Sequence, residues 1–249
     1  MKSFPKPYLL IKGQGTPVLI LHGWGGSNAS WQTFTDQAQD QFTWVMFDLP
    51  GFGKTEAPKE AWTVTDYQNW CEQIYNDLPD KIKPQYILTH SFGGRIAAKW
   101  LQKKHPFQKA ILTASAGIKP EPTFKTKLLN FISKITKKIF SESTINRFKY
   151  RFYKLTGIKD FPLDPFMQET FKLVTGEDLT TDFSKIKHGE NITLIWGKDD
   201  KITPLSTGQK INKLIQDSQL IILDNCRHAI HRQQQNELIK ICTRIFLNK

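Results

Sequence analysis

Six short apolar runs, separated by turn-forming residues and helical patterns, constrain the fold of this chain more than any other feature. Each run is rich in strand-forming residues and apolar on both faces, which is typical of a strand buried on both sides of a parallel sheet. The runs cover residues 17–21, 44–47, 86–88, 110–112, 192–196 and 220–223. The helical patterns cover residues 65–78, 93–104, 205–215 and 234–247. This alternation predicts an α/β fold with a mostly parallel central sheet and helices on both faces.

The alternation stops between residues 119 and 187, where no strand-like run occurs. Apolar residues recur there at helical spacing and form one stripe, with lysines on the other side of the helix. The stripe consists of Leu128, Ile132, Ile135 and Ile139. We therefore expect a core of residues 1–118 and 188–249, interrupted by a helical lid over residues 119–187.

Composition excludes several classes of protein. Hydrophobic residues make up 39% of the 249 positions, which is enough for a core and excludes a disordered chain. The three cysteines, Cys71, Cys226 and Cys242, are widely spaced and form no C-x-x-C pair, which indicates a reducing compartment. The first 11 residues do not resemble a secretory signal, and no apolar run approaches the length of a membrane span. We expect a soluble, cytoplasmic protein without a transmembrane segment.

A serine lies between the third apolar run and the helical pattern that follows it. Ligands of open α/β sheets bind beyond the carboxyl ends of the strands, so this position favours chemistry. Residues 89–94 read Thr-His-Ser-Phe-Gly-Gly and are similar to the G-x-S-x-G nucleophile elbow, which lifts the serine hydroxyl above the sheet. Thr89 replaces the first glycine, and we expect its larger side chain to crowd the turn. The alternative is an ordinary strand-to-helix loop that contains a serine.

A glycine-rich loop, residues 22–26, follows the first run. Beside a nucleophile, such a loop can direct a backbone N–H at an oxyanion, together with the amide of Phe92 directly after the serine. A phosphate-binding loop is the alternative, but neither G-x-G-x-x-G nor a G-K-[ST] ending is present.

Acidic and histidine candidates follow the last two runs. Asp199 and Asp200 lie after the fifth run, where a carboxylate can orient a histidine, although paired aspartates are also common on solvated turns. His228 lies just after the sixth run, within reach of a serine on the same edge of the sheet. The chain order Ser91, Asp200, His228 is the order of the α/β-hydrolase triad.

These motifs together resemble the α/β-hydrolase family over nearly the whole chain. They are residues 22–25, 48–53, 90–94, 196–200 and 227–228. The opening of the chain, residues 13–53, is especially similar to pimeloyl-acyl-carrier-protein methyl ester esterases. The resemblance implies an α/β-hydrolase fold with a helical lid, and the family's G-x-x-D spacing selects Asp200 over Asp199. It also implies an oxyanion hole formed by the backbone N–H groups of Trp24 and Phe92.

Some members of the family carry an aspartate nucleophile at this position and open epoxides or remove halide. Ser91 in its place argues against these reactions and favours acyl transfer. We expect a carboxylic ester hydrolase that works through an acyl-enzyme and a Ser91–His228–Asp200 triad, without a cofactor. The alternatives are a carbon–carbon bond hydrolase of diketone-type substrates and a non-catalytic binding protein with this fold. His228 and His231 lie three residues apart, but no third ligand is near, so we expect no metal site.

The predicted lid is strongly basic. Residues 119–155 contain ten lysines and arginines against two glutamates. Three interpretations remain open: solvated lysines on a lid helix, a docking surface for an acidic acyl-carrier protein or anionic substrate, and a helix at a membrane surface. Nucleic-acid binding is not expected, because no recognised module is present. Phe148 and Phe152 are expected to line an apolar acyl pocket for a small-molecule ester.

Overall fold

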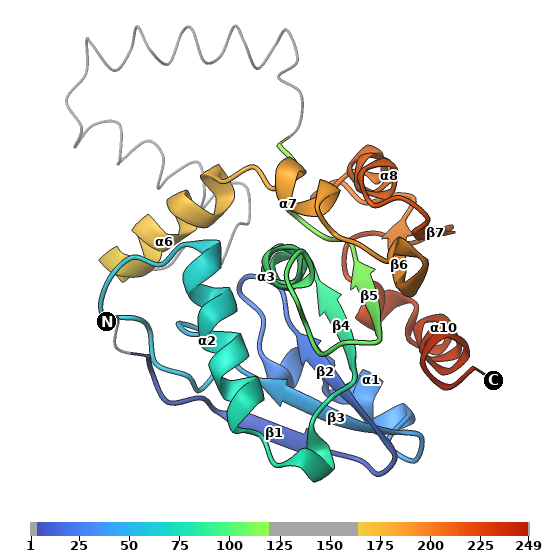
Figure 1. Ribbon diagram of the computed structural model, residues 1–249, viewed down its shortest axis with the longest axis horizontal. Coiled ribbons are helices and arrows are strands. Elements are labelled where there is room, and N and C mark those ends of the chain that lie inside the picture. The colour runs from blue at the N-terminus through green and yellow to red at the C-terminus, as the bar shows by residue number, and fades with distance from the viewer. Residues whose placement is uncertain (1–3, 120–163, 249) are drawn as a thin grey trace, which may run out of the picture. The chain divides into compact units, whose positions relative to one another are not determined.

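The computed structural model describes residues 4–119 and 164–248 (Figure 1). The chain divides into one unit of residues 1–118 and 165–249 and a second of residues 119–164. Residues 165–187, which the sequence placed in the lid, therefore belong to the core unit. Residues 120–163 of the predicted lid, which include Phe148 and Phe152, lie outside the described residues.

A seven-stranded sheet lies at the centre of the core unit, in the order β1-β3-β2-β4-β5-β6-β7. The strands are β1 (Leu9–Lys12), β2 (Thr16–Leu21), β3 (Phe42–Phe47), β4 (Tyr86–His90), β5 (Lys109–Thr113), β6 (Ile192–Gly197) and β7 (Gln219–Leu223). β1 runs antiparallel to β3, and all the other pairs are parallel. All six predicted runs form strands. The sequence missed β1 because this edge strand is partly exposed and lacks a buried apolar run.

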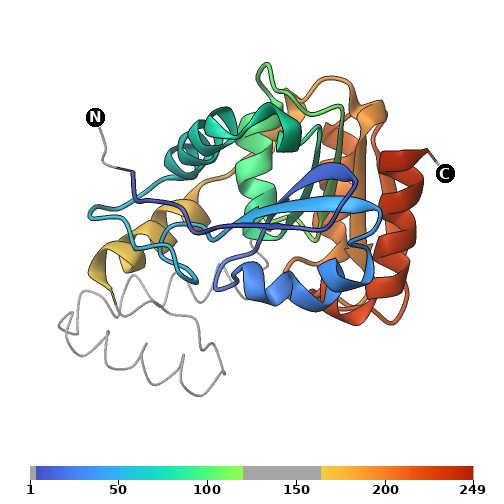
Figure 2. The same cartoon turned by 90° about the horizontal axis from the view of Figure 1, so that it is seen from below.

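Helices cover both faces of the sheet, as predicted (Figures 1 and 2). The longer ones are α2 (Val64–Asp77), α3 (Phe92–Leu101), α6 (Pro165–Gly176), α8 (Leu205–Leu214) and α10 (Gln235–Leu247). The shorter ones are α1 (Gln32–Gln37), α7 (Thr180–Ser184) and α9 (Ile230–Gln233). A capping box starts α2, in which the side chains of Thr63 and Asp66 satisfy each other's backbone N–H groups.

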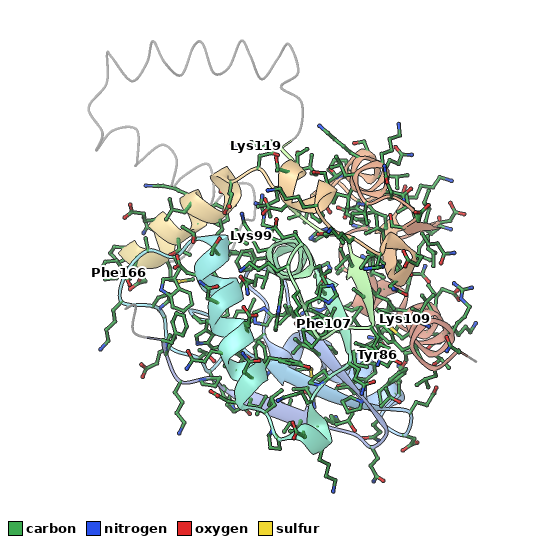
Figure 3. All side chains as sticks on the ribbon, viewed as in Figure 1. Tyr86, Lys99, Phe107, Lys109, Lys119 and Phe166 are labelled. Carbon is green, nitrogen blue, oxygen red and sulfur yellow. The ribbon has the colours of Figure 1, made fainter. Side chains whose placement is uncertain are left out.

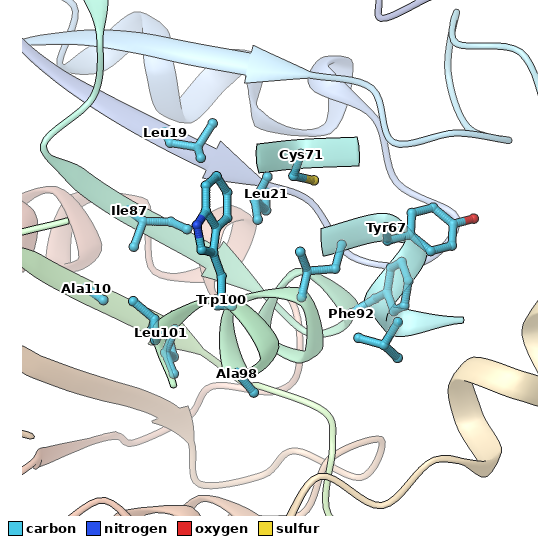
Figure 4. Packing of buried hydrophobic residues seen from close by; sticks show 14 of the residues in the cluster. Leu19, Leu21, Tyr67, Cys71, Ile87, Phe92, Ala98, Trp100, Leu101 and Ala110 are labelled. Atoms are coloured by element: carbon cyan, nitrogen blue, oxygen red, sulfur yellow. The ribbon is translucent and has the colours of Figure 1, made fainter. Parts of the chain in front are cut away.

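Alternate residues of each strand enter two separate apolar cores, because successive side chains point to opposite faces of the sheet. Leu19 and Ile87 face the core that contains residues of α2, α3 and α8. Figure 4 shows Trp100 of α3 packed beside these two residues. Ile20 and Leu88, their neighbours in sequence, face the second core, which contains residues of α1 and α10.

The two ends of the sheet differ in chemistry. Tyr86 and Lys109, which are paired at the amino ends of β4 and β5, mark one end (Figure 3). The predicted catalytic residues all follow the opposite, carboxyl ends of β4, β6 and β7. Parallel strands bring these three ends to the same edge of the sheet, which is where ligands bind in such folds.

Candidate active site

Ser91 lies on a tight turn between β4 and α3. Its backbone adopts φ 51° and ψ −106°, a conformation that is unfavourable for a residue with a side chain. The Ser91 N–H donates to the carbonyl of Thr113 on β5, and the Ser91 carbonyl accepts from the N–H groups of Gly94 and Ala116. These contacts with the neighbouring strand end hold the strained turn in place.

Two glycines after the serine let the helix approach the sheet closely. A Cβ on Gly93 would lie 2.3 Å from the carbonyl oxygen of Leu21, at the end of β2. A Cβ on Gly94 would lie 2.0 Å from the hydroxyl of Ser115. Both distances are far below van der Waals contact, so neither position accepts a side chain without a backbone shift.

Thr89, which replaces the first glycine of the nucleophile elbow, is the fourth residue of β4 and fully buried. The turn forms despite its larger side chain, because Thr89 still belongs to the strand and the turn begins after it. Its hydroxyl is buried and has no hydrogen-bond partner in the part of the chain that the structure describes.

The structure brings Ser91, His228 and Asp200 together in one line of hydrogen bonds. The Ser91 hydroxyl lies 3.0 Å from Nε2 of His228, and Nδ1 of His228 lies 2.7 Å from Oδ2 of Asp200. The Asp200 side chain is fully buried, whereas that of His228 remains 15% exposed. When Nδ1–H of His228 donates to the Asp200 carboxylate, Nε2 is free to accept the serine proton.

Backbone contacts join the loops that carry Asp200 and His228. The N–H of Asp199 donates to the carbonyl of Cys226, and the N–H of Lys198 donates to that of Leu223. A Cβ on Gly197 would lie 2.4 Å from the carbonyl oxygens of Cys226 and Arg227, so the close approach requires glycine. Arg227, directly before His228, is exposed.

Asp200 is held as a carboxylate by its hydrogen bonds. Burial raises its pKa, but the hydrogen bond and the attraction from His228, together with donation from Ile202 and Thr203, outweigh burial and leave the pKa lowered. A buried, ionised carboxylate next to an imidazole stabilises the charged form of that imidazole, which forms when it takes a proton from the serine.

The backbone N–H groups of Trp24 and Phe92, which the sequence predicts as an oxyanion hole, belong to segments next to Ser91. Phe92 is the first residue of α3, so its N–H has no acceptor within the helix. Gly23 lies directly against the nucleophile, because a Cβ placed on it would be 3.2 Å from the Cβ of Ser91. Trp24 follows Gly23, and its ring lies 5.2 Å from that of Phe92. Among the described residues, neither Trp24 nor Phe92 donates a backbone hydrogen bond to the protein.

His22 and Asp48 support the loop that carries Trp24. Nε2 of His22 accepts from the N–H of Leu49, and its Nδ1 lies 2.8 Å from the carbonyl oxygen of Gly23. Asp48 accepts from the N–H groups of Asn28 and Lys54. Both side chains therefore have structural partners.

Two buried histidines lie behind His228. The ring centroid of His90 is 4.7 Å from that of His228 and 4.9 Å from that of His231. His231 stacks on Trp31 at 4.3 Å, and both of its ring nitrogens are buried without a hydrogen-bond partner among the described residues. Burial, assisted by Arg232 and His228, lowers the pKa of His231 to about 3. The sequence did not single out His231 for this environment, because its burial depends on packing against a distant tryptophan.

This buried imidazole predicts a specific loss of stability in acid. In the unfolded chain His231 titrates near 6.5, so the unfolded state binds more protons than the folded state below that pH. Stability is therefore complete above about pH 6.5 and falls as the pH drops toward the folded pKa. The free energy of unfolding of the wild type should fall by about 2 kcal/mol more than that of His231→Phe when the pH drops from about 7.5 to about 5.

Chemical denaturation of both proteins at the two pH values measures this difference. Phenylalanine keeps a ring against Trp31, and His188→Asn serves as the control because the His188 side chain is 77% exposed. The control should follow the wild type. An equal acid-induced loss in His231→Phe and wild type would show that folding does not lower the pKa of His231.

Within the described residues, no group of three or more histidine, cysteine or acidic side chains is arranged to hold a metal ion. Among the same residues, no helix has the length and apolar composition needed to cross a membrane. Of the ten basic residues between 119 and 155, nine lie outside the described part of the chain, and only Lys119 falls inside it.

Several proteins with known names are similar to this chain along most of its length. An uncharacterized hydrolase, YugF, from Bacillus subtilis is 27% identical over 89% of this chain and 86% of its own. A 2-hydroxy-6-oxo-2,4-heptadienoate hydrolase from Pseudomonas putida is 22% identical, covering 92% and 88%. A pimeloyl-[acyl-carrier protein] methyl ester esterase from Aliivibrio fischeri is 22% identical, covering 97% of each.

The fold has the same architecture as solved hydrolases. The enol-lactonase from Burkholderia xenovorans LB400 superimposes with a TM-score of 0.74 at 14% identity, covering 98% of this chain and 97% of its own. The sheet order, the turn at Ser91 and this likeness define the fold as that of an α/β-hydrolase. Residues 15–235 match the family model described as serine aminopeptidase, S33, and the chain belongs to this family of α/β-hydrolases.

Proposed function

We propose that this hydrolase cleaves a carboxylic ester through an acyl-enzyme, with Ser91, His228 and Asp200 as its catalytic triad. The observation that carries the proposal is the unbroken line of hydrogen bonds from the Ser91 hydroxyl through the imidazole to a buried carboxylate. Nucleophile, base and orienting acid thus lie within the distances that serine hydrolysis requires.

In the first half of the reaction, Oγ of Ser91 attacks the acyl carbon and its proton moves to Nε2 of His228. The N–H groups of Trp24 and Phe92 hold the negative charge that develops on the carbonyl oxygen. Phe92 begins α3, and the dipole of this helix also favours a negative charge at its N-terminus. The carbon–oxygen bond to the alcohol then breaks, and the alcohol leaves with the proton from Nε2.

In the second half, His228 removes a proton from water, and the resulting hydroxide attacks the acyl carbon of the Ser91 ester. The tetrahedral intermediate collapses, the carboxylic acid leaves, and Oγ of Ser91 recovers the proton from Nε2. Asp200 stays ionised throughout and stabilises the imidazolium in both halves. The mechanism needs no cofactor.

A second candidate function is hydrolysis of a carbon–carbon bond beside a carbonyl, which can use the same triad. It is favoured by the similarity to the 2-hydroxy-6-oxo-2,4-heptadienoate hydrolase of Pseudomonas putida. The similarity to a methyl ester esterase covers slightly more of the chain and favours esters.

The purified protein should be tested on p-nitrophenyl esters of increasing acyl length and on ring-cleavage diketones. We expect measurable kcat/KM on the esters that exceeds the value on any diketone. A preference for diketones would transfer the assignment to carbon–carbon hydrolysis. Turnover of neither class, by a folded protein, would favour a binding role for the fold.

The proposal also includes a cellular compartment and a protein partner. Cys71, Cys226 and Cys242 are all free and buried, which supports a reducing compartment such as the cytoplasm. An acidic acyl-carrier protein as partner stays a prediction, supported by the basic residues between 119 and 155.

A further inference from the structure

Thr203, three residues after Asp200, places a buried hydroxyl beside the carboxylate. Its Oγ1 lies 2.9 Å from Oδ2 of Asp200, 3.1 Å from the carbonyl oxygen of Ala114 and 3.3 Å from Nδ1 of His228. The residue is only 8% exposed. One hydroxyl therefore contacts the acid, the base and the end of β5.

The backbone of Thr203 is held on both sides, so the position of its hydroxyl is set by the scaffold. Its N–H donates to Oδ1 of Asp200 at 3.0 Å, and its carbonyl accepts from Nε1 of Trp196 at 2.8 Å. The indole of Trp196 in turn lies against Gly208 of α8, where a Cβ would be 2.6 Å from the ring. These contacts fix the loop between β6 and α8.

The hydroxyl carries one proton and can donate to one acceptor at a time. A charged carboxylate is a stronger acceptor than a peptide carbonyl, and the distance to Asp200 is the shorter of the two. Donation to Oδ2 gives Asp200 four donors: the N–H groups of Ile202 and Thr203 on Oδ1, and the groups of Thr203 and His228 on Oδ2. A carboxylate has about four acceptor sites, so all of them are filled.

We propose that Thr203 is a positioning residue of the triad, whose hydroxyl fixes the Asp200 carboxylate in the orientation that receives Nδ1–H of His228. The inference rests on the proposed function, because it assigns Thr203 a part in the same proton transfer. A carboxylate that loses one of its four donors gains freedom to rotate, and the imidazole it orients gains the same freedom. The misplacement affects the chemical step and not the binding of the ester.

The test compares Thr203→Val, which removes the hydroxyl at nearly constant volume, with Thr203→Ser, which keeps it. We expect Thr203→Val to lower kcat for the best ester by about 10- to 100-fold with little change in KM. Thr203→Ser should recover most of this activity. Thr193→Val, at a buried threonine of β6 that is paired with Ile111 and Gln219 and not with the triad, is the matched control and should leave kcat unchanged.

Thr203→Cys keeps the test decisive if the valine variant does not fold, because a thiol is a weak donor of similar size. Its kcat should then lie clearly below that of Thr203→Ser. A kcat in Thr203→Val or Thr203→Cys equal to that of the wild type, or a loss confined to KM, would overturn the inference.

Proton NMR of the Nδ1–H of His228 supplies a second readout that needs no substrate. The signal should be sharp in the wild type and Thr203→Ser, and broadened by exchange with water in Thr203→Val. If the wild type cleaves no ester, the proposed function fails while the NMR signal still decides the role of Thr203. If esters are cleaved and the signal is identical in all variants, the positioning role fails and the proposed function stands.

Discussion

Replacing Ser91 with alanine is expected to lower kcat on the best ester by about 10⁴- to 10⁶-fold, because no other group can form the acyl-enzyme. The residual rate comes from the oxyanion donors and from binding of the substrate. Alanine keeps the Cβ, so the φ of 51° at this turn is as strained as before and the fold should be unaffected.

Steady-state kinetics with a sensitive chromogenic ester, together with thermal unfolding of the same preparation, measures both effects. Ser184→Ala is the matched control, because that serine is exposed at the end of α7 and its hydroxyl donates to the carbonyl of Thr181. The control should keep full activity. A folded Ser91→Ala protein with a rate within roughly tenfold of the wild type would place the nucleophile elsewhere.

The second large effect is expected for Asp200→Asn, with a loss of about 10³- to 10⁴-fold in kcat. Asparagine has nearly the same shape, but its amide can donate to Nδ1 and so favours the tautomer that carries the proton on Nε2. That tautomer cannot accept the proton of Ser91. The loss should be smaller at high pH, where hydroxide partly replaces the base.

Asp199→Asn is a sharp control, since it makes the same change one residue away on an exposed side chain. The backbone N–H of Asp199 donates to the carbonyl of Cys226, and this bond survives the substitution. The pair of variants also tests the choice between the two adjacent aspartates. A large loss in Asp199→Asn and none in Asp200→Asn would reverse that choice.

Five strands, β2 to β6, could be predicted because they are largely buried on both faces and therefore read as continuous apolar runs. β7 is a partly exposed edge strand, but its apolar run, residues 220–223, still marked it. β1, which is also partly exposed at an edge, is only four residues long and could not be predicted. The helices α2, α3, α8 and α10 begin and end within a few residues of their predicted positions, because each presents an apolar stripe to the sheet.

The candidate site was predictable in its residue types and chain order, because the topology brings the ends of parallel strands to one edge. Its supporting contacts were not. Thr203 appears in the sequence as an ordinary turn residue, and only the folded loop shows its hydroxyl 2.9 Å from Asp200. The left-handed backbone of Ala114, with φ 45°, and the buried ring of His231 likewise depend on packing between distant segments.

The central claim is that Ser91 is activated as a nucleophile by His228. It is tested most directly by treating the protein with a fluorophosphonate, followed by intact-mass measurement and peptide mapping. The account predicts one adduct per chain, on the peptide containing Ser91, which disappears in Ser91→Ala and forms much more slowly in His228→Ala. A folded wild-type protein that remains unlabelled, or an adduct on any other residue, would contradict it.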